Sequence, residues 1–163
     1  MPQPRGKPIS THYFEDADHA SEKVTMRSQT GILIFWNRAP VIWLSKKQNS
    51  VETSTFGSEF TAIKLTVELV IALRYNMCMF GVPLEVPTDM VCDNKEVLKN
   101  TSTPDSVLRK KRHSIVYHKC REVVASLICS IVKEDIETNL ADLFTKILGH
   151  NRGDFLLNLF TYW

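Results

Sequence analysis

The sequence lacks the features that mark membrane-spanning, secreted and zinc-binding chains. No apolar run approaches the roughly 18 residues that a membrane-spanning helix needs, and the polar, proline-rich residues 1–10 contain no apolar segment of a signal peptide. The four cysteines show no CxxC spacing, so we interpret them as reduced thiols rather than disulfides or zinc ligands. We expect an intracellular chain without a membrane partner, with a flexible N-terminal arm at 1–10 and a single domain at 11–163.

The chain also lacks a strong excess of one charge. Its formal net charge of +2 is too small to demonstrate a polyanionic partner. The basic residues are nevertheless clustered, in a block at Arg109–Arg112 and a smaller pair at Lys46–Lys47. Such blocks bind phosphates in some proteins and are solvated helix surfaces in others. Charge alone favours the second interpretation.

Hydrophobic patterning predicts an α/β fold. Apolar and β-branched runs predict five strands, at residues 11–18, 31–36, 41–45, 85–92 and 127–132. Caps and helical spacing predict helices after Ser54–Thr55, at 95–100, from 103–106 to about 125, after Asn139 and at 154–160. Three strands in sequence, followed by strands that alternate with helices, predict a mixed sheet with helices on its faces.

Two local expectations accompany this pattern. Residues 37–40 include Pro40 and are expected to break the first hairpin between its strands. The helix that Asn139 caps is expected to carry Leu140, Leu143, Phe144 and Ile147 on one stripe.

Four acidic residues lie at ends of predicted elements: Asp16, Glu59, Asp93 and Asp142. Each has a structural explanation when it is taken alone. Asp16 suits a turn and Asp93 suits a helix cap. Glu59 suits the positive end of a helix dipole, and Asp142 resembles the acidic half of a capping box that begins at Asn139.

Taken together, the four carboxylates indicate a metal site. The predicted topology brings their elements close, and carboxylates without lysine or arginine partners repel one another. A divalent cation removes that cost, and Mg²⁺ prefers oxygen ligands. Two such ions about 4 Å apart stabilise the attacking and leaving oxygens of phosphodiester cleavage. Zinc is not indicated, because no histidine and cysteine set has ligand spacing.

Several short motifs also occur in a specific order. They are Asp16–Asp18, Arg27–Gly31, Trp43–Gln48, Ser54–Thr55, Glu59–Phe60, Cys92–Asn94, Lys111–Glu122 and Asn139–Lys146. With these motifs, from about Tyr13 to Leu148, the chain resembles the ribonuclease H domain of copia-type LTR retrotransposon polyproteins.

The resemblance implies a ribonuclease H-like fold, a five-stranded mixed sheet with three antiparallel strands and then two parallel ones. It implies an endonuclease that hydrolyses the RNA strand of RNA–DNA hybrids and leaves 5′-phosphate products. It places the catalytic, metal-binding carboxylates at Asp16, Glu59, Asp93 and Asp142, which would hold two Mg²⁺ ions, with Mn²⁺ as a substitute. Because the family's domain follows a reverse transcriptase in one polyprotein, a reverse transcriptase domain is an expected partner.

Substrate contacts are expected around these carboxylates. Ser54, Thr55 and Asn94 are candidates for contacts in the wide minor groove, where RNA displays its 2′-hydroxyls. Arg109 and Lys110 are candidates for contacts to phosphates of the DNA strand. We expect a monomer that acts in the cytoplasm, inside an element particle, or in the nucleus.

Departures from the family pattern leave other readings open. Phe56-Gly57-Ser58 stands where the family has small or acidic residues, and His19 stands where many members have Trp. Gly57 weakens the first helical turn by about 1 kcal/mol relative to Ala. The chain can therefore also be read as a catalytically weak or inactive module that binds hybrid or acts as a scaffold. A third reading, an integrase-like DNA strand transferase of the same fold, is disfavoured by the four carboxylates.

Overall fold

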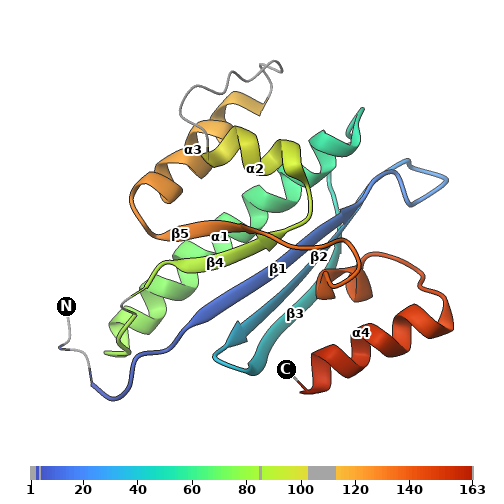
Figure 1. Ribbon diagram of the computed structural model, residues 1–163. Helices are drawn as coiled ribbons and strands as arrows, with labels where there is room; N and C mark the ends of the chain where they lie inside the picture. Colours follow the sequence, from blue (N-terminus) through green and yellow to red (C-terminus); the bar gives the residue numbers. More distant parts are fainter. Residues whose placement is uncertain (1–2, 4, 85, 103–112, 163) are drawn as a thin grey trace.

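A five-stranded mixed sheet forms the centre of the molecule (Figure 1). The computed structural model describes residues 3, 5–84, 86–102 and 113–162. The strands are β1 (Thr11–Asp18), β2 (Gln29–Trp36), β3 (Ala39–Lys47), β4 (Thr88–Cys92) and β5 (Cys129–Lys133). They lie in the order β3-β2-β1-β4-β5, with β1, β2 and β3 antiparallel and with β4 parallel to both β1 and β5. The predicted fold class is confirmed.

Helices cover both faces of this sheet. The helical elements are α1 (Thr55–Met79), α2 (Lys95–Ser102), α3 (Ser114–Ala125), the 3-10 helix η2 (Leu140–Phe144) and α4 (His150–Tyr162). Helices α1, α2 and α3 lie on one side, and η2 and α4 lie on the other (Figure 1). Among the described residues, no helix combines the length and apolar character needed to cross a membrane.

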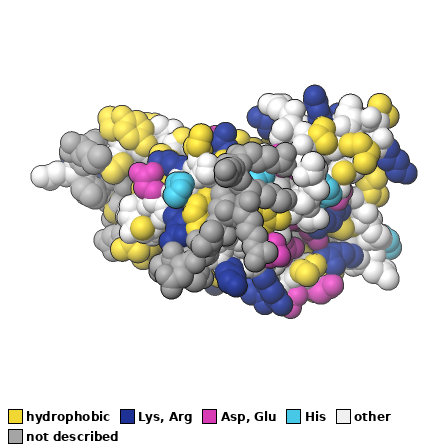
Figure 2. Space-filling model, turned by 90° about the horizontal axis from the view of Figure 1, so that it is seen from above, with side chains coloured by type: hydrophobic (Ala, Val, Ile, Leu, Met, Phe, Trp, Pro, Cys, Tyr) yellow, Lys and Arg dark blue, Asp and Glu magenta, His cyan; other side chains and the backbone are white. Residues whose placement is uncertain are grey.

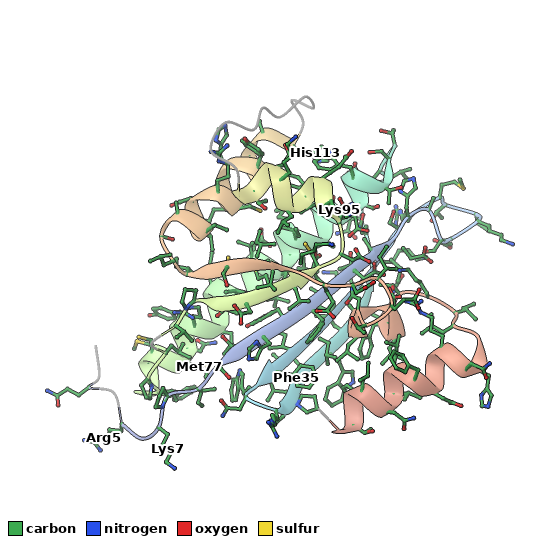
Figure 3. All side chains as sticks on the ribbon, viewed as in Figure 1. Arg5, Lys7, Phe35, Met77, Lys95 and His113 are labelled. Atoms are coloured by element: carbon green, nitrogen blue, oxygen red, sulfur yellow. The ribbon has the colours of Figure 1, made fainter. Side chains whose placement is uncertain are left out.

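Strand β1 lies in the middle of the sheet and is buried on both faces. Tyr13 is fully buried in the cluster that α1 and α3 cover, whereas Phe14 belongs to the cluster beneath α4. Successive side chains of a strand point to opposite faces, so the two clusters alternate along β1. Phe35 of β2 lies between Phe14 and Phe160, with ring centroids 5.8 and 6.2 Å away (Figure 3).

The hairpin between β2 and β3 is tighter than expected. Only Asn37 and Arg38 lie between the strands, and Asn37 has a φ of 53°, which suits a two-residue turn. The expected break at 37–40 is therefore wrong for Ala39 and Pro40, which belong to β3. Pro40 lacks an N–H donor, but it lies on an edge strand where the register shifts, and proline is tolerated there.

The expected starts of β4 and β5 differ from the structure. Strand β4 begins at Thr88 rather than at 85, and Glu85 lies outside the described residues. Strand β5 begins at Cys129, because Leu127 has a φ of 56° in the preceding turn. The expected helix start at 103–106 also falls outside the described residues, whose third α-helix begins at Ser114.

The last part of the chain departs furthest from expectation. Asn139 does cap a helix, because its side chain accepts a hydrogen bond from the Ala141 N–H at 3.1 Å. That helix is a 3-10 helix that ends at Phe144, and Ile147 is fully exposed instead of sharing its stripe. Helix α4, expected as one or two turns, has 13 residues and buries Leu156 beneath it.

Gly31 allows η2 to approach the sheet. A Cβ at this position would lie 2.7 Å from the Ala141 carbonyl oxygen and 2.7 Å from the Thr145 methyl group. We expect Gly31→Ala to lower the free energy of unfolding by about 1–3 kcal/mol through overpacking, measured by urea denaturation.

Gly153→Ala in α4 is the matched control, because a Cβ at that position would meet no atom within 4 Å. It should raise the free energy of unfolding by roughly 0.5–1 kcal/mol. Equal stability of Gly31→Ala and wild type would show that η2 does not depend on this close approach.

Candidate active site

Three carboxylates meet at one edge of the sheet. One oxygen from each of Asp16, Glu59 and Asp93 lies within 4.8 Å of the others. Strands β1 and β4 are parallel and pair His12 with Asp89, and the same offset brings Asp16 level with Asp93. Figure 3 shows oxygen-bearing side chains gathered beside this end of β1, close to the start of α2 at Lys95. Carboxyl ends of parallel strands are the usual location of ligand sites in such sheets.

Glu59 has a different role from the one its helix position suggests. It is the fifth residue of α1, and no acidic residue lies in the first turn, so the helix-dipole explanation is wrong. Its side chain is buried against the sheet rather than exposed at the helix end. Helix α1 therefore delivers Glu59 to the strand ends that carry Asp16 and Asp93.

Asp142 lies apart from this trio and is held by cations. Its carboxylate accepts hydrogen bonds from Lys146 Nζ at 2.5 Å and from Arg152 Nη2 at 2.6 Å. Lys146 Nζ also lies 3.1 Å from Asp16 Oδ2, and the Thr145 hydroxyl donates to the same oxygen. The expectation that the carboxylates lack lysine and arginine partners is therefore wrong for Asp16 and Asp142. The capping-box interpretation of Asp142 does not describe these contacts.

Burial sets the electrostatics of the trio. Burial, followed by the charges of Asp16 and Asp93, raises the pKa of Glu59 to about 9. Burial also raises the pKa values of Asp16 and Asp93, although the Thr145 hydrogen bond and Lys146 oppose it at Asp16. Burial alone would lower the pKa of Lys146, but Asp142 and Asp16 together raise it. A nearby positive charge would therefore stabilise the ionised forms of these carboxylates.

Glu15 is a buried carboxyl that sequence reasoning missed. Its side chain is 1% exposed, and neither of its carboxyl oxygens has a hydrogen-bond partner among the described residues. Burial and then the charge of Glu59 raise its pKa well above the ordinary value. The available signal was strand alternation, because Tyr13 and Glu15 share the α1 face of β1.

The structure places three of the five residues that were predicted to contact substrate. Ser54 caps α1 and accepts a hydrogen bond from the Gly57 N–H at 3.2 Å, whereas Thr55 is exposed beside it. Asn94 caps α2 and accepts from the N–H of Glu96 at 2.9 Å. The positions Arg109 and Lys110 lie outside the described residues.

The altered start of α1 has a local explanation. A Cβ at Gly57 would lie 2.5 Å from Glu52 Oε2, so the Glu52 carboxylate uses the space that a larger residue would fill. Glu52 and His113 are both buried, and Glu52 Oε2 lies 3.5 Å from His113 Nε2. Glycine therefore permits a buried acid–histidine contact between the start of α1 and the residue before α3.

The donor set fits a hard divalent cation. All three grouped residues offer carboxylate oxygens, which are the ligands that Mg²⁺ and Mn²⁺ accept. Burial above all, and neighbouring carboxylates in addition, raise their pKa values, so their ionised forms are costly without a cation. Asp16, Glu59 and Asp93 would hold such an ion. Asp142 is not part of this group, and the Lys146 ammonium lies against both Asp142 and Asp16.

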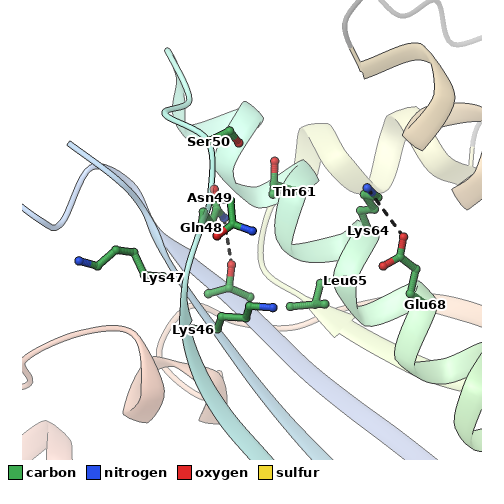
Figure 4. Close-up of a pocket in the computed structure, with 10 residues that line it drawn as sticks. Lys46, Lys47, Gln48, Asn49, Ser50, Thr61, Lys64, Leu65 and Glu68 are labelled. Atoms are coloured by element: carbon green, nitrogen blue, oxygen red, sulfur yellow. Dashed lines mark hydrogen bonds and ion pairs between the residues drawn. The ribbon is translucent and has the colours of Figure 1, made fainter. Parts of the chain in front are cut away.

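A hollow of about 360 Å³ lies between β3 and α1 (Figure 4). Lys46 of β3 and Lys64 of α1 line it, and Lys64 pairs with Glu68 at 3.8 Å. Buried Gln48 forms part of its wall and donates from Nε2 to the Ser58 carbonyl oxygen at 2.9 Å. This basic hollow therefore adjoins the turn of α1 that carries Glu59.

Segments of larger polyproteins are similar to this chain. The retrovirus-related Pol polyprotein from transposon RE1 of Arabidopsis thaliana is 29% identical over 145 residues, which cover 89% of this chain and 10% of the polyprotein. The one from transposon TNT 1-94 of Nicotiana tabacum is 27% identical over 139 residues, 85% of this chain and 10% of the polyprotein. The chain spans about a tenth of the length of these curated relatives. No protein-family model matches it.

Solved structures share the fold. The N-terminal RNase H domain of a Mycobacterium tuberculosis protein matches with a TM-score of 0.61 and 9% identity, over 93% of this chain and 98% of that one. LC11-RNase H1 in complex with RNA/DNA hybrid matches with a TM-score of 0.61 and 13% identity, over 83% and 94%. The Prototype Foamy Virus protease-reverse transcriptase matches with a TM-score of 0.53 and 11% identity, over 98% and 21%. The resemblance to ribonuclease H domains of transposon polyproteins is confirmed.

The raised pKa of Glu59 predicts how stability depends on pH without divalent metal. Because its pKa is about 9 in the folded chain, against an ordinary 4.5, the folded chain binds more protons than the unfolded chain between these values. The free energy of unfolding should therefore fall as pH rises from about 5 to 9. Glu59→Gln should flatten this decline, measured by urea denaturation in EDTA.

Glu68→Gln, on the exposed face of the same helix, should retain the wild-type pH dependence. If Glu59→Gln declined as steeply as wild type, Glu59 would not be the group that titrates.

Proposed function

We propose that this chain is a metal-dependent endonuclease that hydrolyses the RNA strand of RNA–DNA hybrids. The observation that carries the proposal is the convergence of Asp16, Glu59 and Asp93 oxygens within 4.8 Å, at strand ends of a ribonuclease H fold. Relatives among transposon Pol polyproteins and a ribonuclease H neighbour described in complex with RNA/DNA hybrid support it.

The chemistry requires charge stabilisation at a phosphodiester. A water oxygen forms a bond to phosphorus, the bond from phosphorus to the 3′ oxygen breaks, and the proton lost by water balances the one gained by the 3′ oxygen. Mg²⁺, with Mn²⁺ as a substitute, would supply Lewis-acid stabilisation of the developing charges when two ions are bound. Asp16, Glu59 and Asp93 would hold one ion, and Asp16 and Asp142 would hold the second.

Selectivity for RNA would arise beside Glu59. Thr55, whose hydroxyl can donate, is exposed one turn before Glu59, and Ser54, which accepts from the Gly57 N–H, precedes it. Asn94 follows Asp93 directly, and its side-chain oxygen caps α2 while its amide nitrogen carries N–H donors. These groups can donate to 2′-hydroxyls, which distinguish RNA from DNA.

Phosphate contacts would extend from the basic hollow. Seen from the side of α2 and α3, side chains of both charges are mixed over the surface (Figure 2). The hollow lined by Lys46 and Lys64 is a more specific candidate, because Gln48 joins it to the backbone of Ser58, next to Glu59. A hybrid whose scissile phosphate lies at the carboxylates would then place a neighbouring phosphate at this hollow.

The partner implied by the relatives is a reverse transcriptase segment of one polyprotein. The curated relatives are Pol polyproteins, and the foamy virus neighbour is a protease-reverse transcriptase chain. We infer that this chain removes the RNA template strand after its copying into DNA, in an element particle in the cytoplasm or in the nucleus.

A non-catalytic module that binds hybrid is the second candidate. Lys146 and Arg152 already neutralise Asp142, and Lys146 also contacts Asp16, which reduces the charge that a second metal ion would balance. Metal titration separates the candidates, because an ion that binds only the folded chain raises its unfolding temperature by mass action. An inactive module would show no such rise with Mg²⁺ or Mn²⁺.

Cleavage of a labelled RNA–DNA hybrid in Mg²⁺ tests the main proposal on a denaturing gel. Asp93→Asn should lower the cleavage rate by on the order of a hundredfold or more, because it removes a charged ligand at the reacting centre. Asp89→Asn is the matched control on the same strand, since Asp89 pairs with Ser130 at 2.6 Å, outside the carboxylate trio. Undiminished cleavage by Asp93→Asn, or no cleavage by wild type, would refute the assignment, and cleavage of plain DNA duplex would favour a strand transferase.

The basic hollow makes a separate prediction about binding. Lys46→Ala and Lys64→Ala should each weaken hybrid binding and reduce the slope of log affinity against log salt by about 1, measured by fluorescence anisotropy in Ca²⁺. Lys119→Ala, an exposed lysine on α3 that pairs with Glu122, should leave the slope unchanged. Equal slopes for all variants would exclude the hollow as a phosphate contact.

A further inference from the structure

Lys146 bridges two carboxylates that come from distant parts of the chain. Its ammonium lies 2.5 Å from Asp142 Oδ1 and 3.1 Å from Asp16 Oδ2. Both carboxylate side chains are 2% exposed, whereas the Lys146 side chain is 33% exposed. A buried pair of acids thus shares one cation whose side chain is partly exposed to solvent.

The surrounding contacts hold the two acids without help from Lys146. The Thr145 hydroxyl donates to Asp16 Oδ2. Arg152 of α4 donates to Asp142 Oδ2 at 2.6 Å and to the Ile136 carbonyl oxygen at 2.6 Å. Asp16 and Asp142 would therefore keep their positions if the ammonium moved away.

The position of this ammonium conflicts with a second divalent ion. An ion ligated by both Asp16 and Asp142 needs the same carboxylate oxygens, and positive charges a few ångströms apart repel strongly where water is largely excluded. The trio of Asp16, Glu59 and Asp93 has no such competitor at its shared centre, because Lys146 contacts only Asp16 of the three in the described structure.

We propose that Lys146 is a resident cation that occupies the second metal position and must be displaced before a second divalent ion binds. The inference rests on the proposed metal site. The first ion then binds the trio readily, and the second binds more weakly because the ammonium must leave. Because the Lys146 side chain is partly exposed, the ammonium can move outward, where it can meet a substrate phosphate.

Mn²⁺ binding to the substrate-free protein tests this, followed by electron paramagnetic resonance of free Mn²⁺ and by calorimetry. Wild type should bind one ion tightly and a second at least about tenfold more weakly, consistent with the repulsion expected between like charges at this separation. Lys146→Met, and Lys146→Gln as a second variant, should tighten the weaker step by roughly tenfold and leave the first step within about twofold.

Two controls separate displacement from general charge effects. Lys64→Met removes a lysine from the basic hollow and should leave both binding steps unchanged. Arg152→Met removes a positive charge from Asp142 but not from Asp16, so it should not tighten the second step as Lys146→Met does. Thermal unfolding of each variant checks that it is folded.

The outcomes distinguish this inference from the proposed function. If wild type binds two ions equally, or if Lys146→Met and Lys146→Gln bind like wild type, Lys146 does not compete for the second position. Equal tightening by Arg152→Met would also overturn the inference. If neither wild type nor any variant binds Mn²⁺, the metal site itself fails, and the proposed function fails with it.

Discussion

The cost of burying several carboxylates at one edge of the sheet is the constraint on which the rest of the site depends. Oxygens of Asp16, Glu59 and Asp93 lie within 4.8 Å of one another, and Glu15 lies buried beside them. Burial removes the water that would screen these charges, so the acids favour their protonated forms or a nearby cation. The fold accepts this cost, and under the proposed function the negative charge would serve a phosphodiester reaction with divalent metal.

The second face of the sheet supplies the compensating charge. Residues after β5 form η2, which carries Asp142, and α4. Lys146, two residues after η2, and Arg152 of α4 both contact Asp142. Gly31 of β2 lets η2 lie close enough for Thr145 and Lys146 to reach Asp16. Packing on the α4 side and electrostatics at the strand ends are therefore coupled. The coupled residues are distant in sequence, since Gly31 and Asp16 are more than a hundred positions from Thr145 and Lys146.

Helix α1 has a double role at this edge. Its apolar residues pack against β1 and β2, and its fifth residue, Glu59, completes the carboxylate trio. The turn before it is stabilised by Ser54, and Gly57 leaves room for Glu52 to contact His113. The unusual residues at the helix start thus have a structural partner and leave Glu59 in place.

The sequence by itself determined the order of strands and helices along the chain, the α/β class and the strand-end positions of Asp16 and Asp93. These follow from side-chain periodicity and caps, which are local properties. Glu59 and Asp142 needed the family resemblance, since a helix position does not reveal what the helix faces. Lys146 lies four residues after Asp142, a spacing that sequence could have used. Strand alternation could have placed Glu15 on the α1 face of β1, but not its burial among other carboxylates. Arg152 could not be assigned, nor could Pro40 inside an edge strand. These features depend on how α4 docks, on which carboxylates are buried away from water and on which strand lies at the edge of the sheet. All three are decided only when distant segments pack together.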